Sequence, residues 1–156
     1  MFSLNEKFTV KDQQEKDVYY VEGSFFKIPK TFSIKDTSNN QIALITKKVF
    51  SLLPKFYIEI NGENVLTINK ELSFFKARYT IDAAGIEVSG NWWDMDFRVF
   101  QNEEEVGRVS KEWFTWGDSY KVQILKEETE AILIALVVAI NCVKADQAAA
   151  SSASVD

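Results

Sequence analysis

The sequence predicts an all-β protein with one buried helix, and three observations carry this prediction. A short unit that starts with an aromatic residue recurs along the chain, aromatic residues are abundant, and one uncharged apolar run stands near the end. The chain has 156 residues with twelve Phe and four Trp, but only six Gly and two Pro. Short apolar runs rich in aromatic residues favour strands. The length suits a single domain that needs no disulfide or metal to fold.

The recurring unit opens with an aromatic residue that is followed two positions later by Val or Ile. The pairs are Phe8/Val10, Phe32/Ile34, Phe56/Ile58, Tyr79/Ile81, Phe97/Val99 and Tyr120/Val122. Residues i and i+2 of a strand lie on the same face. Each pair therefore predicts a half-buried strand.

Polar turns and a second strand complete each unit. Asn61-Gly62 suits a type I′ turn because both residues tolerate positive φ, and Asn39-Asn40, Ala84-Gly85 and Asn102-Glu103 fall at equivalent places. The second strands carry apolar pairs spaced three apart, namely Val18/Val21, Ile42/Ile45, Val65/Ile68 and Val106/Val109. Period two would place such a pair on opposite faces. Either both faces are partly covered or a β-bulge intervenes.

Hairpins in series predict about twelve antiparallel strands. An open sheet of that width would expose long edges that invite aggregation, and closure into a barrel removes them. A solenoid is the alternative, but antiparallel hairpins favour a barrel or a sandwich, and we expect a closed barrel. A barrel this wide is too large for its own side chains to fill. Bulky pairs close the units, namely Phe25-Phe26, Val49-Phe50, Phe74-Phe75, Trp92-Trp93 and Trp113-Phe114. The aromatic corners Trp92, Trp93, Trp113, Phe114 and Trp116 are expected to seal a barrel end, or otherwise to form a ligand or membrane-interface platform.

The run "AILIALVVAINCV", residues 131 to 143, predicts a helix that occupies the barrel. Glu127, Glu128 and Glu130 precede it and Lys144 follows, which is the charge order that favours a helix dipole. A helix that is apolar on every face must be buried on every face. At about 1.5 Å per residue the run is roughly 20 Å long, short of the roughly 30 Å of a bilayer core. We therefore prefer a central helix to a membrane anchor or a partner-docking helix, and expect no transmembrane segment.

These hairpins, followed by an apolar C-terminal helix with acidic residues ahead of it, resemble the LURP-one-related family of the tubby C-terminal-like superfamily. The resemblance implies a twelve-stranded β-barrel domain over residues 1–146, wrapped around a hydrophobic helix, with a fold like that of phospholipid scramblases. Tubby domains of this superfamily bind phosphoinositides, but their basic residues are not matched to positions here. No cysteine-rich palmitoylation segment is present. Residues 147–156 are small and polar, and are expected to form a disordered tail.

Composition argues against several functions. A net charge of −5 argues against nucleic-acid binding. The chain has no histidine, which removes the commonest general base and metal ligand. Cys142 lies within the apolar run and is expected to be a buried, inert thiol. We expect no catalytic residue, metal or cofactor. The start "MFSLNEKF" has no signal-peptide pattern, so the expected location is cytoplasmic, either free or peripheral at the membrane.

The expected function is a non-enzymatic binding or scaffold domain that recognises a phospholipid headgroup or a protein partner. The candidate binding residues are Lys47, Lys48, Lys55, Lys76, Arg78, Trp92 and Trp93. If the strands bring the basic residues together, they can hold a phosphate by charge-assisted hydrogen bonds; otherwise they are an ordinary charged surface. The alternative is a hydrolase-like enzyme that uses Asp94 and Asp96, whose i, i+2 spacing suits one face of a strand, although a polar turn between two strands is the preferred explanation of these two residues. The ligand and the oligomeric state stay open.

Overall fold

A computed structural model describes residues 8–11, 14, 16–24, 30–48, 55–71, 78–83, 85–111 and 120–153. These residues form eleven β-strands, one short 3₁₀ helix and one α-helix. The chain divides next to Asp82 into two compact units. The first unit holds a seven-stranded sheet, and the second holds a four-stranded sheet and both helices.

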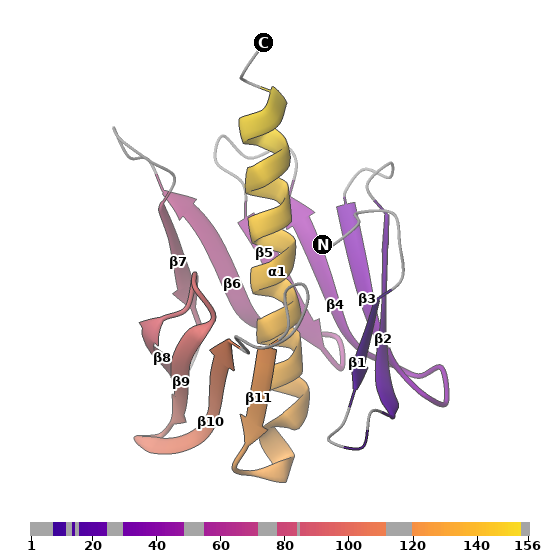
Figure 1. Ribbon diagram of the computed structural model, residues 1–156, viewed down its shortest axis with the longest axis vertical. Coiled ribbons are helices and arrows are strands. Elements are labelled where there is room, and N and C mark those ends of the chain that lie inside the picture. The colour runs from indigo at the N-terminus through magenta and orange to yellow at the C-terminus, as the bar shows by residue number, and fades with distance from the viewer. Residues whose placement is uncertain are drawn as a thin grey trace. The chain divides into compact units, whose positions relative to one another are not determined.

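The sheet of the first unit is an antiparallel meander whose strands are paired in chain order (Figure 1). Its strands are β1 Phe8–Lys11, β2 Asp17–Ser24, β3 Lys30–Asp36, β4 Gln41–Lys48, β5 Lys55–Ile60, β6 Glu63–Glu71 and β7 Arg78–Asp82. One face is apolar, because alternate residues along each strand face the same side. Phe32 and Ile34 of β3 and Phe56 and Ile58 of β5 are buried, which confirms the predicted pairing of an aromatic residue with the apolar residue two positions later.

A β-bulge explains each apolar pair with a spacing of three. In the pairing of β4 with β3, Ala43 lies opposite Ile34 and Gln41 lies opposite Lys35, so Ile42 is the extra residue. The registers of β2, β6 and β10 jump in the same way past Val18, Val65 and Val106. The bulge, one of the two predicted explanations, is therefore confirmed in all four pairs. Each bulge accommodates one extra residue, so the strand keeps both apolar residues of the pair and its pairing continues on either side of the bulge.

The predicted hairpin turns adopt left-handed backbone conformations. Asn61 and Gly62 have φ angles of 53° and 80°, as a type I′ turn requires. Asn102 and Glu103 have φ angles of 51° and 68°, and Asn39 has a φ of 66°. Asparagine tolerates this region better than most residues because its short side chain bonds locally.

The second unit contains a four-stranded antiparallel sheet and the C-terminal helices. Its strands are β8 Ile86–Asn91, β9 Asp96–Gln101, β10 Glu104–Lys111 and β11 Tyr120–Ile124, again paired in chain order. The 3₁₀ helix η1 (Glu127–Thr129) leads into α1 (Glu130–Ala153). Gly107 of β10 lies against Leu133 of α1, so the helix packs on the face of the sheet that carries the buried Val109.

The predicted closed barrel of about twelve strands is wrong. The first sheet is a half-barrel and the second is open. The break falls in the fourth predicted hairpin, where β7 pairs with β6 and β8 pairs with β9 instead of with each other. At Gly85 the backbone carbonyl accepts a hydrogen bond from the amide of Asn102, in the turn between β9 and β10. That bond joins the turn after β7 to the second sheet, and the antiparallel ladder does not continue across it.

The apolar run is a buried helix, as predicted. Residues 133 to 140 are all buried, and so are Cys142 and Val143. The helix also continues to Ala153, through most of the segment expected to be a disordered tail. Alanine is the strongest helix former, so the alanine-rich stretch after residue 147 prolongs a helix that tertiary packing has already nucleated. In the described part of the chain, no helix has both the length and the hydrophobicity needed to cross a membrane.

Candidate functional site

Basic residues gather at one end of the seven-stranded sheet. This end is formed by the last residues of β4 and β6 and the first residues of β3, β5 and β7, which antiparallel pairing brings side by side. We call it the basic end, and its cationic residues are Lys30, Lys47, Lys48, Lys55, Lys70 and Arg78. Lys30 lies opposite Lys47 in the register, and Lys48 lies opposite Lys55. The acidic residue of these strand ends is Glu71, opposite Arg78.

Lys48 and Lys55 form the most distinctive pair of the basic end. Both side chains are exposed, and they occupy directly opposed positions on neighbouring strands. Within the described residues, no carboxylate pairs with either of them. Like charges that face each other across two strands destabilise a sheet. A bound anion would relieve this repulsion.

The other end of the same sheet carries charges of both signs. Asp17 and Asp36 lie there, and Lys11 and Lys35 lie nearby. Lys11 is 4.0 Å from Asp17, and Lys35 is 3.6 Å from Glu22. The lysines of this end therefore have carboxylate partners, unlike Lys48 and Lys55.

The seven predicted binding residues are divided between the two units. Lys47, Lys48, Lys55 and Arg78 belong to the basic end, where the half-buried Lys47 has further interactions within the protein. Lys76 lies outside the described residues. Trp92 and Trp93 belong to the second unit, in the turn between β8 and β9, and their rings pack edge to face at 5.7 Å between centroids. Both tryptophans are half-buried. The other predicted aromatic corners lie outside the described residues.

Asp94 and Asp96 do not share one face of a strand. Asp94 lies in the turn before β9, and Met95 between them has a φ of 59°. The carboxylate of Asp94 accepts a 2.7 Å hydrogen bond from the side-chain amide of Asn91, and its backbone amide donates to the Asn91 side-chain oxygen at 3.1 Å. Asp96 starts β9. The pair is thus a turn residue and a strand residue, and the hydrolase alternative stays a prediction.

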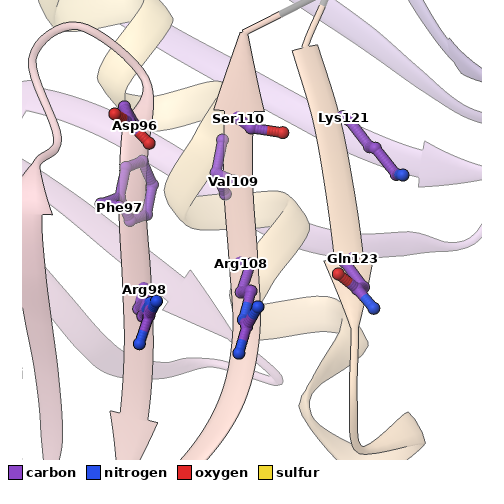
Figure 2. A pocket seen from close by; sticks show the side chains of 8 residues that line it. All are labelled: Asp96, Phe97, Arg98, Arg108, Val109, Ser110, Lys121 and Gln123. Carbon is purple, nitrogen blue, oxygen red and sulfur yellow. The ribbon is translucent and has the colours of Figure 1, made fainter.

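A second group of polar side chains surrounds a depression of about 310 Å³ on the four-stranded sheet. Figure 2 shows these side chains on the neighbouring strands β9, β10 and β11. The residues that line it are Asp96, Phe97, Arg98, Arg108, Val109, Ser110, Lys121 and Gln123. Arg98 and Arg108 are directly opposed, and their side chains are 59% and 49% exposed. The polar residues alternate with Phe97 and Val109, so they occupy the face that points away from α1.

Glu105 is hydrogen-bonded to Arg108 and lies farther from Arg98. It forms a two-bond ion pair with Arg108, and one of its carboxylate oxygens lies 3.9 Å from Nε of Arg98. The hydrogen bond from Arg108 lowers the pKa of Glu105; partial desolvation opposes this shift, and the charges of Arg108 and Arg98 add to it. One negative carboxylate thus lies near two positive guanidinium groups, so Glu105, Arg98 and Arg108 together carry a net positive charge.

The sequence contains a signal for the basic residues of this second group, which are not among the predicted binding residues. Arg98 and Lys121 each stand directly after the aromatic residue that opens a unit, in "FRV" and "YKV". Phe97 and Val99 on either side of Arg98 are buried, so the middle position of this unit faces outward, and Lys121 at the equivalent position is exposed. In earlier units the same position holds Thr9, Ser33, Tyr57 and Thr80. A change from neutral to basic at the outward position of the last two units was therefore visible in the repeat.

Among the described residues, no three His, Cys, Asp or Glu side chains gather closely enough to hold a metal ion. The second unit and the first thus each present a cationic surface, and neither presents a cluster of metal ligands within those ranges. The fold and these surfaces define a class, an all-β protein with a C-terminal helix and two basic surfaces.

Comparison with known proteins narrows the class to a family. The model of the LURP-one-related family matches residues 1–141, and this chain belongs to that family. A relative, the uncharacterized protein YxjI of Bacillus subtilis (strain 168), is 34% identical over 143 residues, which cover 92% of this chain and 88% of the relative. The X-ray structure of a protein from Arabidopsis thaliana is similar with a TM-score of 0.56, at 13% identity, over 88% of this chain and 86% of that one. This last similarity concerns the fold alone.

Proposed function

We propose that the protein is a non-enzymatic binding domain that recognises phosphate-bearing headgroups of anionic lipids through the basic end of its seven-stranded sheet. The observation that carries the proposal is the directly opposed pair Lys48 and Lys55, exposed and without carboxylate partners in the described residues. Lys47 and Lys70 add positive charge to the same end of the sheet from its other face, which carries the buried Ile45 and Ile68. Lys30 and Arg78 occupy strand-end positions there.

The chemistry of the pair suits a surface of phosphates. A lysine ammonium is a compact charge on a flexible stem with three donors, so it reaches phosphate oxygens in several geometries. Each lysine close to an anionic membrane surface contributes about 1 kcal/mol of binding free energy. The protein as a whole has a net charge of −5 and is therefore repelled by an anionic surface. Binding therefore requires that the basic end faces the membrane, and this requirement orients the protein.

Vesicle co-sedimentation tests the proposal. The wild type is expected to sediment with phosphatidylcholine vesicles that contain phosphatidylserine or a phosphatidylinositol phosphate, and to stay in solution with phosphatidylcholine alone. Lys48→Gln/Lys55→Gln is expected to bind about 30-fold more weakly, since about 1 kcal/mol is lost per lysine. Added salt should weaken wild-type binding, because the Debye length is only about 10 Å at 0.1 M.

The matched control is Lys11→Gln/Lys35→Gln, which removes the same charge from the other end of the same sheet. It should bind vesicles like the wild type. If no anionic vesicle sediments the wild type, or if both double variants lose the same affinity, the lipid proposal is refuted.

A further inference from the structure

We infer that the outward face of β9, β10 and β11 is a second, separate anion site, which takes one phosphate group between Arg98, Arg108 and Lys121 and uses Glu105 as an internal competitor for it. This site lies in the second unit and shares no residue with the basic end.

Strand pairing arranges the residues in two rows. Arg98, Arg108 and Gln123 are opposed across three strands and form one row. Ser110 and Lys121 are opposed and belong to the next row, two residues further along β10. Figure 2 shows the two arginines level with each other on neighbouring strands, with Lys121 on the third strand. Two guanidinium groups and one ammonium thus surround the same 310 Å³ depression.

Most of the donors around the depression are unused. The 3.9 Å between Arg98 Nε and Glu105 is too long for a hydrogen bond. Within the described residues, the side chains of Lys121, Ser110 and Gln123 have no hydrogen-bonding or ionic partner. Guanidinium groups bind phosphate oxygens in a two-bond geometry, and a hydroxyl and an amide can fill the remaining oxygen positions. The donor set is therefore suited to one tetrahedral oxyanion.

The charges indicate where the phosphate sits. Arg98 and Arg108 repel each other across the strands, and Glu105, whose side chain is 20% exposed, neutralises only one of them. Asp96 stands at the start of β9, level with Ser110 and Lys121 in Figure 2 and on the side of the depression away from Glu105, and it repels an anion from the β9 end of that row. A phosphate is thus favoured between the two arginines and Lys121. Because Arg108 is already paired with Glu105, a bound phosphate must either displace the Glu105 carboxylate or bind Arg108 together with it.

Titration with inorganic phosphate, followed by amide chemical shifts in ¹⁵N-labelled protein, tests the site. Saturable shifts are expected at Arg98, Arg108, Ser110, Lys121 and Gln123. Arg98→Gln/Lys121→Gln should weaken phosphate binding at least tenfold, because it removes two charged donors. Glu105→Gln should tighten binding, because it releases Arg108 and removes a competing charge.

The control Lys11→Gln/Lys35→Gln makes the same change in net charge outside the site and should leave the phosphate shifts unchanged. An absence of saturable shifts on these strands, equal losses in both double variants, or binding by Glu105→Gln no tighter than that of the wild type would overturn the inference. A native amide spectrum of each variant ensures that a loss is not due to unfolding.

Vesicle binding identifies the source of the phosphate. If Arg98→Gln/Lys121→Gln loses phosphate shifts but still sediments with anionic vesicles, the site takes a free phosphate-bearing molecule. If it loses both while Lys48→Gln/Lys55→Gln keeps its phosphate shifts, the site takes a lipid headgroup. Either pattern supports the second site. The first pattern also requires vesicle binding by the basic end, whereas the phosphate shifts and their loss in Arg98→Gln/Lys121→Gln test the second site whether or not the basic end binds lipid.

Discussion

Single polar side chains organise the turns of this protein. Asp36 ends β3, and its carboxylate accepts hydrogen bonds of 2.9 Å from the backbone amides of Ser38 and Asn40. The Asn40 side-chain amide adds a third bond at 3.3 Å. These bonds tie the β3–β4 turn, in which Asn39 is left-handed, to the end of the strand. Such local bonds replace backbone bonds that a turn cannot make.

The same bonds predict a pH dependence of stability. The hydrogen bond from the Asn40 amide, with smaller contributions from the Asn40 side chain and the Ser38 amide, lowers the pKa of Asp36 below its usual 3.8, against an opposing effect of desolvation. A carboxyl whose pKa is lower in the folded state stabilises the fold above the unfolded-state pKa and loses this contribution as the pH falls through the folded-state value. Asp36→Asn, which resembles the protonated form, should lower the denaturation midpoint at pH 7, and its midpoint should approach that of the wild type as the pH falls through the lowered pKa of Asp36.

Urea denaturation across this pH range measures the difference. Glu63→Gln, at the start of β6, removes one exposed carboxylate from another hairpin of the same sheet and corrects for the change in net charge. A constant difference between Asp36→Asn and the wild type at every pH would show that the carboxylate charge plays no part.

At the scale of elements, the contact between β10 and α1 depends on a missing side chain. A Cβ atom at Gly107 would lie 2.6 and 2.7 Å from the two δ carbons of Leu133, which is itself fully buried. Close-packed interiors have no space to absorb such an overlap. Gly107 follows Val106, the bulged residue of β10, so the bulge and the glycine occur together where the strand meets the helix.

Gly107→Ala is therefore expected to destabilise the protein by about 1–3 kcal/mol, the usual cost of overpacking. In a Leu133→Val background the δ carbons are gone, and the same substitution should cost less. Chemical denaturation of the four proteins gives the coupling between the two positions. An equal cost of Gly107→Ala in both backgrounds would show that Leu133 is not the side chain it meets.

At the scale of the whole molecule, burial of α1 ties the C-terminal segment to the folded state. Eight successive residues, 133 to 140, are buried, and Cys142 is 1% exposed. A helix without a polar face is not stable when it is exposed to water. We therefore expect α1 to leave its site only when the protein unfolds globally.

Labelling of Cys142 by a thiol reagent tests this coupling. The free energy of the opening that exposes the thiol should equal the free energy of global unfolding from denaturant titration. A control protein with Cys142→Ala and Ser89→Cys places the thiol on an exposed strand position and should react at once. Labelling of Cys142 much faster than global unfolding would mean that the helix detaches from a folded remainder.

Features that depend on local spacing can be read from the sequence alone. Aromatic residues with a Val or Ile two positions later predicted the strands, Asn61-Gly62 predicted a turn with positive φ, and residues 131 to 143 predicted the buried helix. The spacing of three in the second strands left a bulge as one of two explanations. These features follow from backbone geometry within a few residues, and so they are readable without long-range contacts.

Tertiary contacts determine which strands pair, where the hydrogen-bonded ladder ends and which charged residues lie opposite each other. Nothing local marks the junction after β7 as the break between two sheets, because its residues also suit a hairpin. The opposition of Lys48 to Lys55, and of Arg98 to Arg108, depends on the register between neighbouring strands. The bulge at Val106 shifts the register of β10 against β9 by one residue. The charged surfaces are therefore products of pairing, which residue spacing along one strand does not specify.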